Sequence, residues 1–590
     1  MVLDTFDIDL INQSNETLYF YRQFSNCYKC PLILKATIHS GKQITIQLRS
    51  YFDQLYAIGR DTNDTFWLPA KQQNDSCNVC STDPLDCQSL QTIDARDKSH
   101  YQLIINGQQN CHLEMLESGE NQWLAVSIVI IIYLIIMIGL IFGHRSFMKL
   151  CRNYFTNRGH HSSPSSSLAR HQTDSPTFPS IQSELSSPSL PNTSIRHSNR
   201  FHSIDTFRGI AITLMIFVNY GAGQYKSLEH VAWDGLHLAD IVFPFFIFAM
   251  GMSIAVSFKN IQKINDNRYK IMERIAKRSI KLFLLGIIVN SIGAGNYSDI
   301  GTIRIPGVLQ RFALSYGIVA IVQLFTVNLI SSTIMPRCLN CIKLWPQYAL
   351  ALVMIIIYSY LSFGWRFDPN CPIGYVGPGG LSDNQSYPYC IGGAAHRLDQ
   401  LLFTANHCYR DNFAGPIYNQ GYFPNLWHDP EGLLGSTNSI VLTIIGLQVG
   451  HTVLHNVQPW ARFRRFINMI VLLTITTIVT VYGFKIPINK NLWSISFVTV
   501  NGCLATMIFA LLHYLIDLKR IWPMGQPFNY PGQNSIALYL GHEIASNMFP
   551  FKLFKSYSSH WGYLSENLLA VTIWIWISYW LAINDIFIKV

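Results

Sequence analysis

The sequence carries little charge for its length. Lys, Arg, Asp and Glu make up 13% of its 590 residues, whereas apolar and aromatic residues make up 49%. Soluble globular domains average about 25% charged residues, so this composition argues against an ordinary water-soluble protein. Residues 123–143 contain no charged side chain at all, and a helix of about 20 apolar residues spans the roughly 30 Å hydrocarbon core of a bilayer. The chain is therefore predicted to be a membrane protein.

The beginning of the chain lacks the features of a signal peptide. The opening MVLDTFDIDL has neither a basic segment nor an apolar core. Two explanations are open: the sequence starts after a leader, or residues 123–143 insert as a reverse anchor. We expect the first of these, a truncated start.

Positive charge is distributed unevenly along the chain. The basic residues behind the net charge of +9 gather after predicted spans, at residues 145–158, 259–278, 462–465 and 519–520. Short basic loops beside spans stay on the cytoplasmic side of a membrane. This placement explains the charge without a nucleic-acid partner, and it puts the first ~120 residues on the luminal side.

Residues 1–122 are predicted to form a small luminal β domain linked by disulfides. The stretches ILKATIHS, QITIQLRS and YQLIING alternate apolar and polar residues, as half-buried strands do. The region has six cysteines and four glycosylation sequons, at Asn12, Asn15, Asn63 and Asn74, which is typical of an oxidising compartment. The CYKC and CNVC pairs also fit a zinc ribbon. Disulfides are favoured, because oxidation removes the thiolates that zinc needs.

The rest of the chain divides into a linker and a helical region. Residues 144–200 are rich in Ser and Pro and are predicted to be a disordered cytoplasmic linker. Residues 201–590 contain ten apolar segments, centred near residues 215, 247, 286, 318, 354, 443, 474, 505, 542 and 576. The predicted fold is a polytopic α-helical membrane protein of about 11 spans, with a luminal N-terminus and a cytoplasmic C-terminus. The loop at residues 365–432 is then luminal, and its sequon at Asn384 agrees.

Polar side chains gather around the second and third predicted spans. Asn219 ends the second span, His230 follows it, and Asp240 lies about one turn into the third. Ionisable groups at membrane depth are costly and usually functional, and a buried carboxylate commonly orients an imidazole. A helical stretch would put His230, His237 and Asp240 on one face, although three glycines within it argue against a continuous helix. An interfacial loop histidine, and an asparagine that only bridges two helices, are the open alternatives.

Three later stretches carry further candidates. Arg311 in the fifth span is either a structural counter-ion or an anion ligand. Asn489 and Lys490 open the ninth span, where interfacial snorkelling is the usual explanation for a lysine. His542 and Glu543 form a polar pair in the tenth. We predict substrate contacts for Asn489, Lys490, His542 and Glu543, and we predict no metal site.

Six ordered motifs resemble the heparan-α-glucosaminide N-acetyltransferases, a family of polytopic lysosomal enzymes. They are SIDTFRGIAITLMIFVNYGAGQY with the following EHVAWDGLHLADIVFPFFIFAMG, then RIPGVLQR, GYVGPGG, DPEGLLGSTNSI, NKNLWS and YPGQNSIALYLGHE. The resemblance covers essentially residues 200–590, after a similar plan of luminal domain and linker. It implies transfer of an acetyl group from cytosolic acetyl-CoA to the terminal glucosamine of heparan sulfate. It also implies a homodimer in the lysosomal membrane.

The resemblance further implies which residues act. It places the family's catalytic histidine on His230 and the asparagine beside it on Asn219, and Asp240 matches a family aspartate. His237 stands where a threonine is expected, so it is left out of the catalytic set.

The co-substrate acetyl-CoA carries phosphate charges, which the protein is expected to bind through basic side chains. Its phosphates do not cross lipid, so they are expected near basic cytoplasmic ends, and we predict Arg208, Arg278 and Arg311 as their ligands. His230 then acts as a general base or as a nucleophile, with Asn219 donating to the developing oxyanion. A proton-coupled transporter, and an acyltransferase with another sugar acceptor, are the alternative functions.

Overall fold

The structure, a computed structural model, describes residues 5–24, 30, 33–49, 54–59, 99–106, 110–117, 126–128, 131, 201–264, 267–293, 300–330, 344–409, 415–419, 422–423, 426–455, 458–553, 557 and 559–588. Its contacts divide the chain into one unit of Met1–Gln122 with His202–Val590 and another of Trp123–Phe201. The predicted first span and the predicted linker, residues 123–200, lie outside the described residues except for 126–128 and 131.

The N-terminal region folds as two small sheets. The strands are β1 (Thr5–Asn12), β2 (Leu18–Phe24), β3 (Ile33–Ile38), β4 (Gln43–Arg49), β5 (Gln54–Gly59), β6 (His100–Asn106) and β7 (Asn110–Glu117). One sheet has the order β4-β1-β6-β7 and the other β3-β2-β5. Strands β1 and β6 run parallel, and every other pair is antiparallel.

Alternating apolar residues build the core of this β domain. Phe6, Ile8 and Leu10 of β1 are at most 1% exposed, because alternate side chains of a strand point to the same face. They pack in one cluster with Phe20 and Ile58 of the other sheet. The three stretches predicted as strands are β3, β4 and β6, so the small β domain is confirmed.

One of the four sequons in this domain lies at a buried position. The Asn12 side chain is fully buried, and its amide donates to the carbonyls of Glu16 and Ile38, at 2.8 and 2.9 Å. A glycan therefore has no room on Asn12 in the folded domain, whereas Asn15 is exposed.

Two observations bear on the predicted disulfides. Cys30 is disulfide-bonded, which agrees with disulfides at the CYKC pair. In the loop at 365–432, Cys371 and Cys390 form a disulfide, with their Cα atoms 5.8 Å apart. The following lie outside the described residues: Cys27, Cys77, Cys80, Cys87 and the side chain of Cys111.

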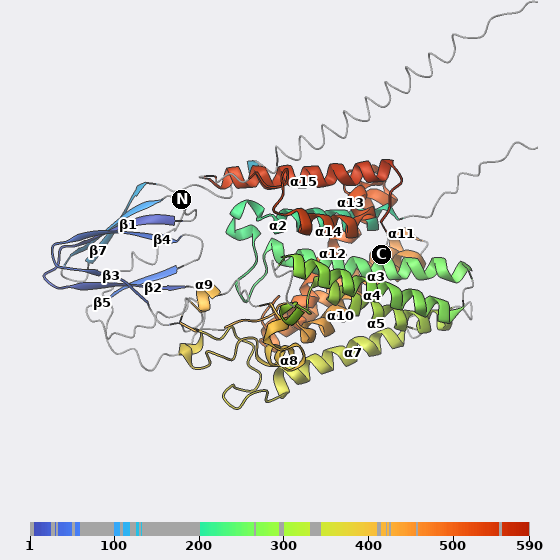
Figure 1. Ribbon diagram of the computed structural model, residues 1–590, viewed down its shortest axis with the longest axis horizontal. Helices are drawn as coiled ribbons and strands as arrows, with labels where there is room; N and C mark the ends of the chain where they lie inside the picture. Colours follow the sequence, from blue (N-terminus) through green and yellow to red (C-terminus); the bar gives the residue numbers. More distant parts are fainter. Residues whose placement is uncertain are drawn as a thin grey trace, which may run out of the picture. The chain divides into compact units, whose positions relative to one another are not determined.

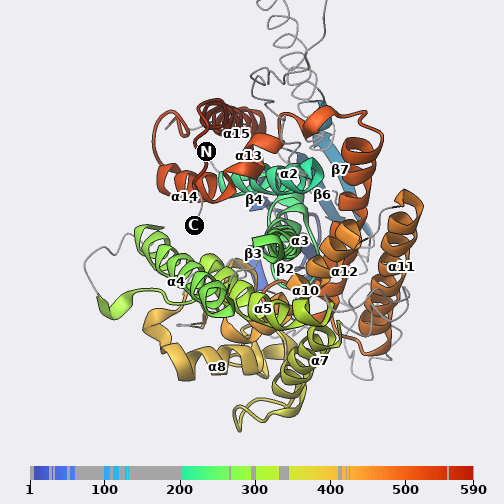
Figure 2. The same ribbon diagram turned by 90° about the vertical axis from the view of Figure 1, so that its right-hand side faces the viewer.

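The second region is helical. Its α-helices are α2 (His202–Asn219), α3 (Leu238–Ile264), α4 (Arg268–Gly293), α5 (Val308–Ile330), α7 (Trp345–Ser359), α8 (Gly393–Phe403), α9 (Gly415–Tyr418), α10 (Leu433–His455), α11 (Pro459–Ile478), α12 (Ile495–Leu512), α13 (Asn529–Gln533), α14 (Ser535–Ala545) and α15 (His560–Ile583). The long helices run side by side in Figure 1. In Figure 2, which looks along them, α3 lies centrally and has α2, α10 and α12 around it.

Seven helices in the described part of the chain are long and apolar enough to cross a membrane. They coincide with the predicted spans centred near residues 247, 318, 354, 443, 474, 505 and 576. Helices α2 and α4 occupy two further predicted positions but are less apolar. The class of a multi-pass helical membrane protein is thereby confirmed, whereas the number of about eleven spans stays a prediction.

The span predicted near residue 542 is not one continuous helix. It is divided into α13 and α14, with Asn534 between them, and α14 alone measures roughly 16 Å at 1.5 Å per residue. Non-helical backbone is tolerated at membrane depth where it is buried in protein. Here Asn534 donates to the carbonyl of Ile586 at 3.0 Å and accepts from the amide of Ile588 at 3.1 Å.

Helices α3 and α10 approach each other closely and run in the same direction, since Gly446 lies against Phe248 and Gly450, one turn later, lies against Ala255. A Cβ atom on Gly251 would lie 2.1 Å from the carbonyl oxygen of Thr443, and one on Gly446 would lie 2.1 Å from that of Phe248. Small residues permit such close helix contacts in membranes. The N-terminal ends of α3 and α10 are consequently at the same end of the bundle, and the polar residues described below gather there.

Candidate functional site

The segment between α2 and α3 is a loop. It contains two short 3₁₀ turns, Ala222–Gln224 and Lys226–Leu228, and α3 begins only at Leu238. Gly235 has φ 130°, a backbone conformation that residues with a Cβ rarely adopt. The hypothetical shared helical face is therefore wrong, and the loop instead brings His230 back over the start of α3.

Asp240 fixes this loop from the third position of α3. One carboxylate oxygen, Oδ2, accepts hydrogen bonds from the backbone amides of His237 at 3.0 Å and Val231 at 3.2 Å. The other, Oδ1, lies 2.8 Å from Nδ1 of His230. The amide of His237 precedes the helix, so Asp240 caps α3 and orients the imidazole with the same carboxylate.

Lys490 reaches the same imidazole from a distant part of the chain. Its Nζ atom lies 2.8 Å from Nδ1 and 3.1 Å from Nε2 of His230, and 3.7 Å from Oδ1 of Asp240. The loop that carries it pairs with the His230 loop through a β-bridge between Asp234 and Asn489. Asn489 is fully buried and donates to the Asp234 carboxylate at 2.9 Å. Its side chain thus holds the two loops together.

The environment favours the neutral form of the His230 imidazole. Burial, and then the charge of Lys490, lower the pKa of His230, and they outweigh the contact with Asp240, which raises it. Protein atoms surround the ring, yet 38% of the side chain is exposed, so solvent reaches part of it. With its Nδ1 proton donated to Asp240, the neutral ring carries its lone pair on Nε2.

A second polar cluster joins the end of α2 to α14. His542 donates from Nδ1 to the carbonyl of Leu538 at 3.0 Å, so its Nε2 accepts from the Asn219 amide at 3.0 Å. The same Asn219 nitrogen donates to Glu543 at 2.8 Å. The structure therefore brings three of the predicted residues together, but in the described part of the chain no hydrogen bond joins Asn219 to His230.

A cavity of about 550 Å³ lies among α2, α3, α4, α5 and α14. Five basic side chains line it, and it is named here the basic cavity: Arg208, Arg274, Lys277, Arg278 and Lys281. The Nε atoms of Arg208 and Arg278 are buried and have no hydrogen-bond partner among the described residues. Two predicted cofactor ligands, Arg208 and Arg278, thus line one cavity, and each has an Nε–H group that donates no hydrogen bond to a described residue.

The basic cavity has a basic end and an aromatic end. Phe258, near the end of α3, packs with Ile271 at the start of α4, where the basic residues begin. Phe246 lines the cavity twelve residues earlier on α3, roughly 18 Å away at 1.5 Å per residue. Asp240 lies six residues further, about 9 Å along the same helix.

The aromatic end approaches both polar clusters. Tyr539 lines the basic cavity, and its ring centroid lies 5.5 Å from that of His542. The cavity therefore adjoins the cluster of His542. Asp240, which contacts His230, lies about 9 Å beyond Phe246 along α3.

Known acetyltransferases are similar to this chain in sequence. Residues 200–361 match the family model described as "Heparan-alpha-glucosaminide N-acetyltransferase, catalytic". The chain is 39% identical over 435 residues to the mouse heparan-alpha-glucosaminide N-acetyltransferase, an alignment that covers 70% of this chain and 65% of the mouse protein. It is 38% identical over 411 residues to the human protein of that name, covering 66% and 60%. Residues 200–361 of the chain are thus similar to the catalytic domain of the heparan-α-glucosaminide N-acetyltransferases.

The matches cover only part of each relative. The chain spans 65% of the mouse relative's length and 60% of the human relative's. The family's catalytic region, residues 200–361, includes His230, Asn219 and Asp240. It ends before Lys490 and His542, so the structure adds contacts from outside the region that defines the family's catalytic domain.

Arg311, the third predicted cofactor ligand, lies outside the basic cavity. It is 2% exposed and donates to the carbonyls of Pro430 and Gly432 at 3.0 and 2.9 Å. Its guanidinium also lies 4.7 Å from the ring centroid of Trp493. Arg311 lines a different cavity, and these contacts favour the structural alternative, so its role as a cofactor ligand stays a prediction.

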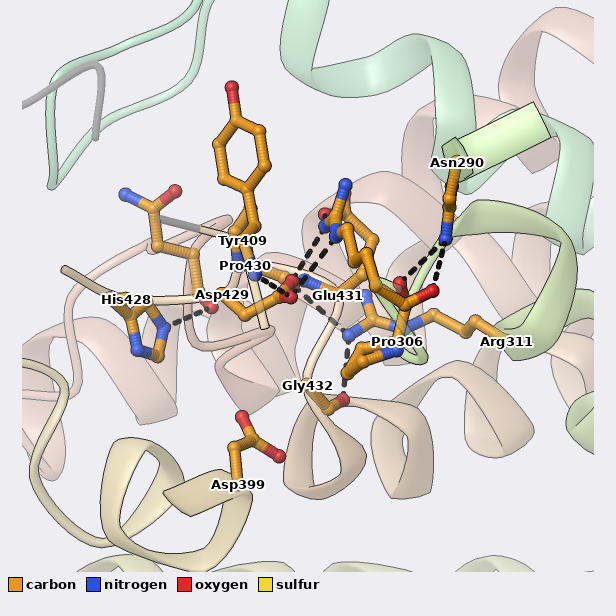
Figure 3. A network of polar contacts seen from close by, with 12 residues as sticks. Asn290, Pro306, Arg311, Asp399, Tyr409, His428, Asp429, Pro430, Glu431 and Gly432 are labelled. Carbon is orange, nitrogen blue, oxygen red and sulfur yellow. Dashed lines mark hydrogen bonds and ion pairs between the residues drawn. The ribbon is translucent and has the colours of Figure 1, made fainter. Parts of the chain in front are cut away.

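Sequence reasoning gave no role to the acidic pair beside Arg311, which Figure 3 shows. Arg304 donates to both carboxylate oxygens of Asp429, at 3.2 and 2.7 Å, and to Glu431 at 2.6 Å. The motif DPEGLLGSTNSI carries a signal that could have found the pair, because it places two carboxylates directly before an apolar helix. Glu431 is thereby held near His230 and Lys490.

Asp399 of α8 leads to a prediction on stability and pH. Its Oδ1 accepts from the amide of Leu433 at 2.9 Å, whereas its buried Oδ2 has no hydrogen-bond partner among the described residues. Burial raises the pKa of Asp399 to about 7, from an ordinary value of about 3.9. The folded chain thus binds this proton more tightly than the unfolded chain. The free energy of unfolding should therefore fall as the pH rises from about 4 to about 7.

The variant Asp399→Asn stays neutral and should remove this loss. We expect the free energy of unfolding of the variant to exceed that of the wild type by about 4 kcal/mol at pH 8 but by only about 1.5 kcal/mol at pH 5, at about 1.4 kcal/mol per pH unit above the ordinary pKa. His396 acts oppositely, since burial lowers its pKa to about 3, and it is unchanged in the variant. Asp368→Asn serves as the control. An equal difference at both pH values would contradict the prediction.

Proposed function

We propose that the chain transfers an acetyl group from acetyl-CoA to the terminal α-glucosamine amine of heparan sulfate, in the lysosomal membrane. The observation that carries this proposal is the Asp240-oriented imidazole of His230 near the aromatic end of the basic cavity. Similarity to two relatives that are named for this activity supports the proposal. We further propose that basic loops face the cytoplasm, that the N-terminus is luminal and that the enzyme is a homodimer.

The basic cavity suits acetyl-CoA by its distribution of charge. The phosphates would contact Arg208 and Arg278, whose Nε atoms are unused. The apolar pantetheine arm would follow Phe246 and Leu309 toward Tyr539, which also line the cavity. The thioester would then reach the end where the two polar clusters lie. Such an arrangement lets a donor enter from one side of the membrane and an acceptor from the other.

The reaction needs a base, because the sugar amine arrives mostly as an ammonium ion. Once deprotonated, its nitrogen attacks the thioester carbonyl, a C–N bond forms, the C–S bond breaks, and the thiolate of coenzyme A leaves. Nε2 of His230 carries a lone pair and either accepts the amine proton or attacks the thioester itself, forming an acetyl-imidazole that the amine then discharges. Asp240 would stabilise the charge that develops on the ring.

The second cluster is proposed to bind the acceptor. The Glu543 side chain is 33% exposed, and a carboxylate there suits the ammonium or hydroxyl groups of a glucosaminide. Both amide protons of Asn219 are engaged by His542 and Glu543. Asn219 would therefore stabilise an oxyanion only after exchanging one of these partners.

The function is tested with the purified full chain in detergent or nanodiscs. It is incubated with labelled acetyl-CoA and a terminal α-glucosaminide, and labelled N-acetylated sugar is the expected product. Solute movement without thioester consumption would favour a transporter instead. Transfer only to a different amino sugar would keep the enzyme class but change the acceptor.

The cavity assignment predicts an effect on donor binding. We expect Arg278→Met to weaken acetyl-CoA binding about 10- to 100-fold, because a hydrogen bond to a charged group contributes about 1.5–3 kcal/mol and 1.4 kcal/mol is tenfold. Isothermal calorimetry with acetyl-CoA measures this. Lys270→Met, an exposed residue of the same helix outside the cavity lining, should bind normally. Equal loss in both variants would contradict the cavity assignment.

A further inference from the structure

His230 lies between groups of opposite charge. The fully buried carboxylate of Asp240 contacts Nδ1, and Glu431 from the segment before α10 adds a second negative charge at longer range. Carboxylates near an imidazole favour its protonated form. An imidazole with only these neighbours would be mostly imidazolium in an acidic compartment, and imidazolium has no lone pair with which to act as base or nucleophile.

Lys490 supplies the opposing charge. Its Nζ atom is within 3.1 Å of both ring nitrogens, so it is not aligned with one lone pair as an ordinary hydrogen-bond donor would be. Among the charged groups that act on His230, the carboxylates come from α3 and from the segment before α10, and Lys490 is the cation at contact distance. Arg311 of α5 faces Lys490 from further away.

The loop around Lys490 is held rigidly. Asn489 is bonded to Asp234 and also accepts from the amide of Leu492 at 2.9 Å. Trp493 is 1% exposed, and the guanidinium of Arg311 lies over its ring. The ammonium is thus presented by a fixed backbone, unlike a lysine that snorkels to a membrane interface.

From this geometry we propose that Lys490 is a positioning residue whose ammonium keeps the imidazole of His230 unprotonated at acidic pH. This role differs from a contact with the sugar. One part of this inference rests on the proposed function: that His230 stays reactive toward the acceptor in an acidic compartment. The electrostatic part concerns the chain alone and is measured without any substrate.

The test uses diethyl pyrocarbonate, which modifies unprotonated imidazole, on the full chain in nanodiscs. Mass spectrometry gives the rate of modification at His230 as a function of pH. In Lys490→Met and in Lys490→Gln, which keeps a polar side chain, we expect the half-maximal rate to move to higher pH by about 1 unit or more, because a contacting charge shifts a titration by about 1–3 units. Lys490→Arg keeps the charge and should restore the wild-type profile.

A matched control removes a charge elsewhere in the same segment. Lys485 is exposed, and Lys485→Met should titrate like the wild type. A profile unchanged in both neutral Lys490 variants, or moved equally by Lys485→Met, would overturn the proposal. In the neutral Lys490 variants, if acetyl transfer is measurable, the fall of kcat/KM at low pH should shift to higher pH together with the modification rate of His230. A modification shift in a chain without transfer activity would leave this inference standing and remove the proposed function.

Discussion

Replacing His230 by alanine is expected to reduce acetyl transfer by about 10²- to 10⁴-fold, the usual cost of losing a general acid or base. Binding of acetyl-CoA should be retained, because the proposed phosphate ligands, Arg208 and Arg278, line the basic cavity and His230 does not. Steady-state rates with labelled acetyl-CoA and calorimetry of donor binding measure the two effects separately. If His230 acts as a nucleophile, its replacement by alanine should reduce the rate of acetyl transfer by at least the same factor.

A neighbouring histidine provides the control for this variant. His237 contacts the backbone carbonyl of Glu229 through Nδ1 at 3.1 Å, so His237→Ala should cost much less. Near-normal turnover in well-folded His230→Ala would make the assignment wrong, and His542 would become the next candidate. Acetyl-CoA alone, without sugar, distinguishes the two mechanisms, since only the nucleophilic route leaves an acetyl group on His230.

Arg304→Met is expected to lower the free energy of unfolding by about 3–5 kcal/mol, because removing one partner of a buried ion pair leaves uncompensated charge. Although burial alone would lower the pKa of Arg304, Asp429 and Glu431 raise it above its ordinary value. The side chain of Asp429 is fully buried, so it cannot turn to water once the guanidinium is gone. Chemical denaturation of the purified variant measures the loss.

Arg366→Met removes an arginine from an exposed position after α7 and serves as the matched control for Arg304. It should unfold within about 0.5 kcal/mol of the wild type, as most surface substitutions do. If Arg304→Met were equally stable, the Arg304 network would not contribute to folding. Glu431 would then need another explanation for its position near His230.

The spacing of apolar residues along the sequence predicted much of the fold. The alternation in β3, β4 and β6 predicted strands, and seven apolar segments predicted the spans that the structure contains. The division at Asn534 was missed, although α13 contains Pro531 and Gly532, because the apolar run of α14 was interpreted as the middle of a single span. The break depends on Asn534 bonding the chain near Ile588, a contact between distant segments.

The candidate site was predicted in part for similar reasons. A carboxylate at Asp240 within an apolar span indicated function, since burying it alone is costly. The contact of Lys490 with His230 joins residues 260 positions apart and depends on the bridge at Asp234, for which local sequence carries no signal. The position of His230 depends on the loop geometry at Gly235, where a helical pattern was the competing interpretation.

The double use of Asp240 has a consequence for how this protein can change over evolutionary time. One carboxylate begins α3 and holds His230, and α3 is the helix around which the others are arranged (Figure 2). A substitution at this position would weaken the central helix and misplace the imidazole in a single step. Selection for a folded membrane protein therefore preserves the geometry of the site as well, even in periods when activity itself is under little pressure.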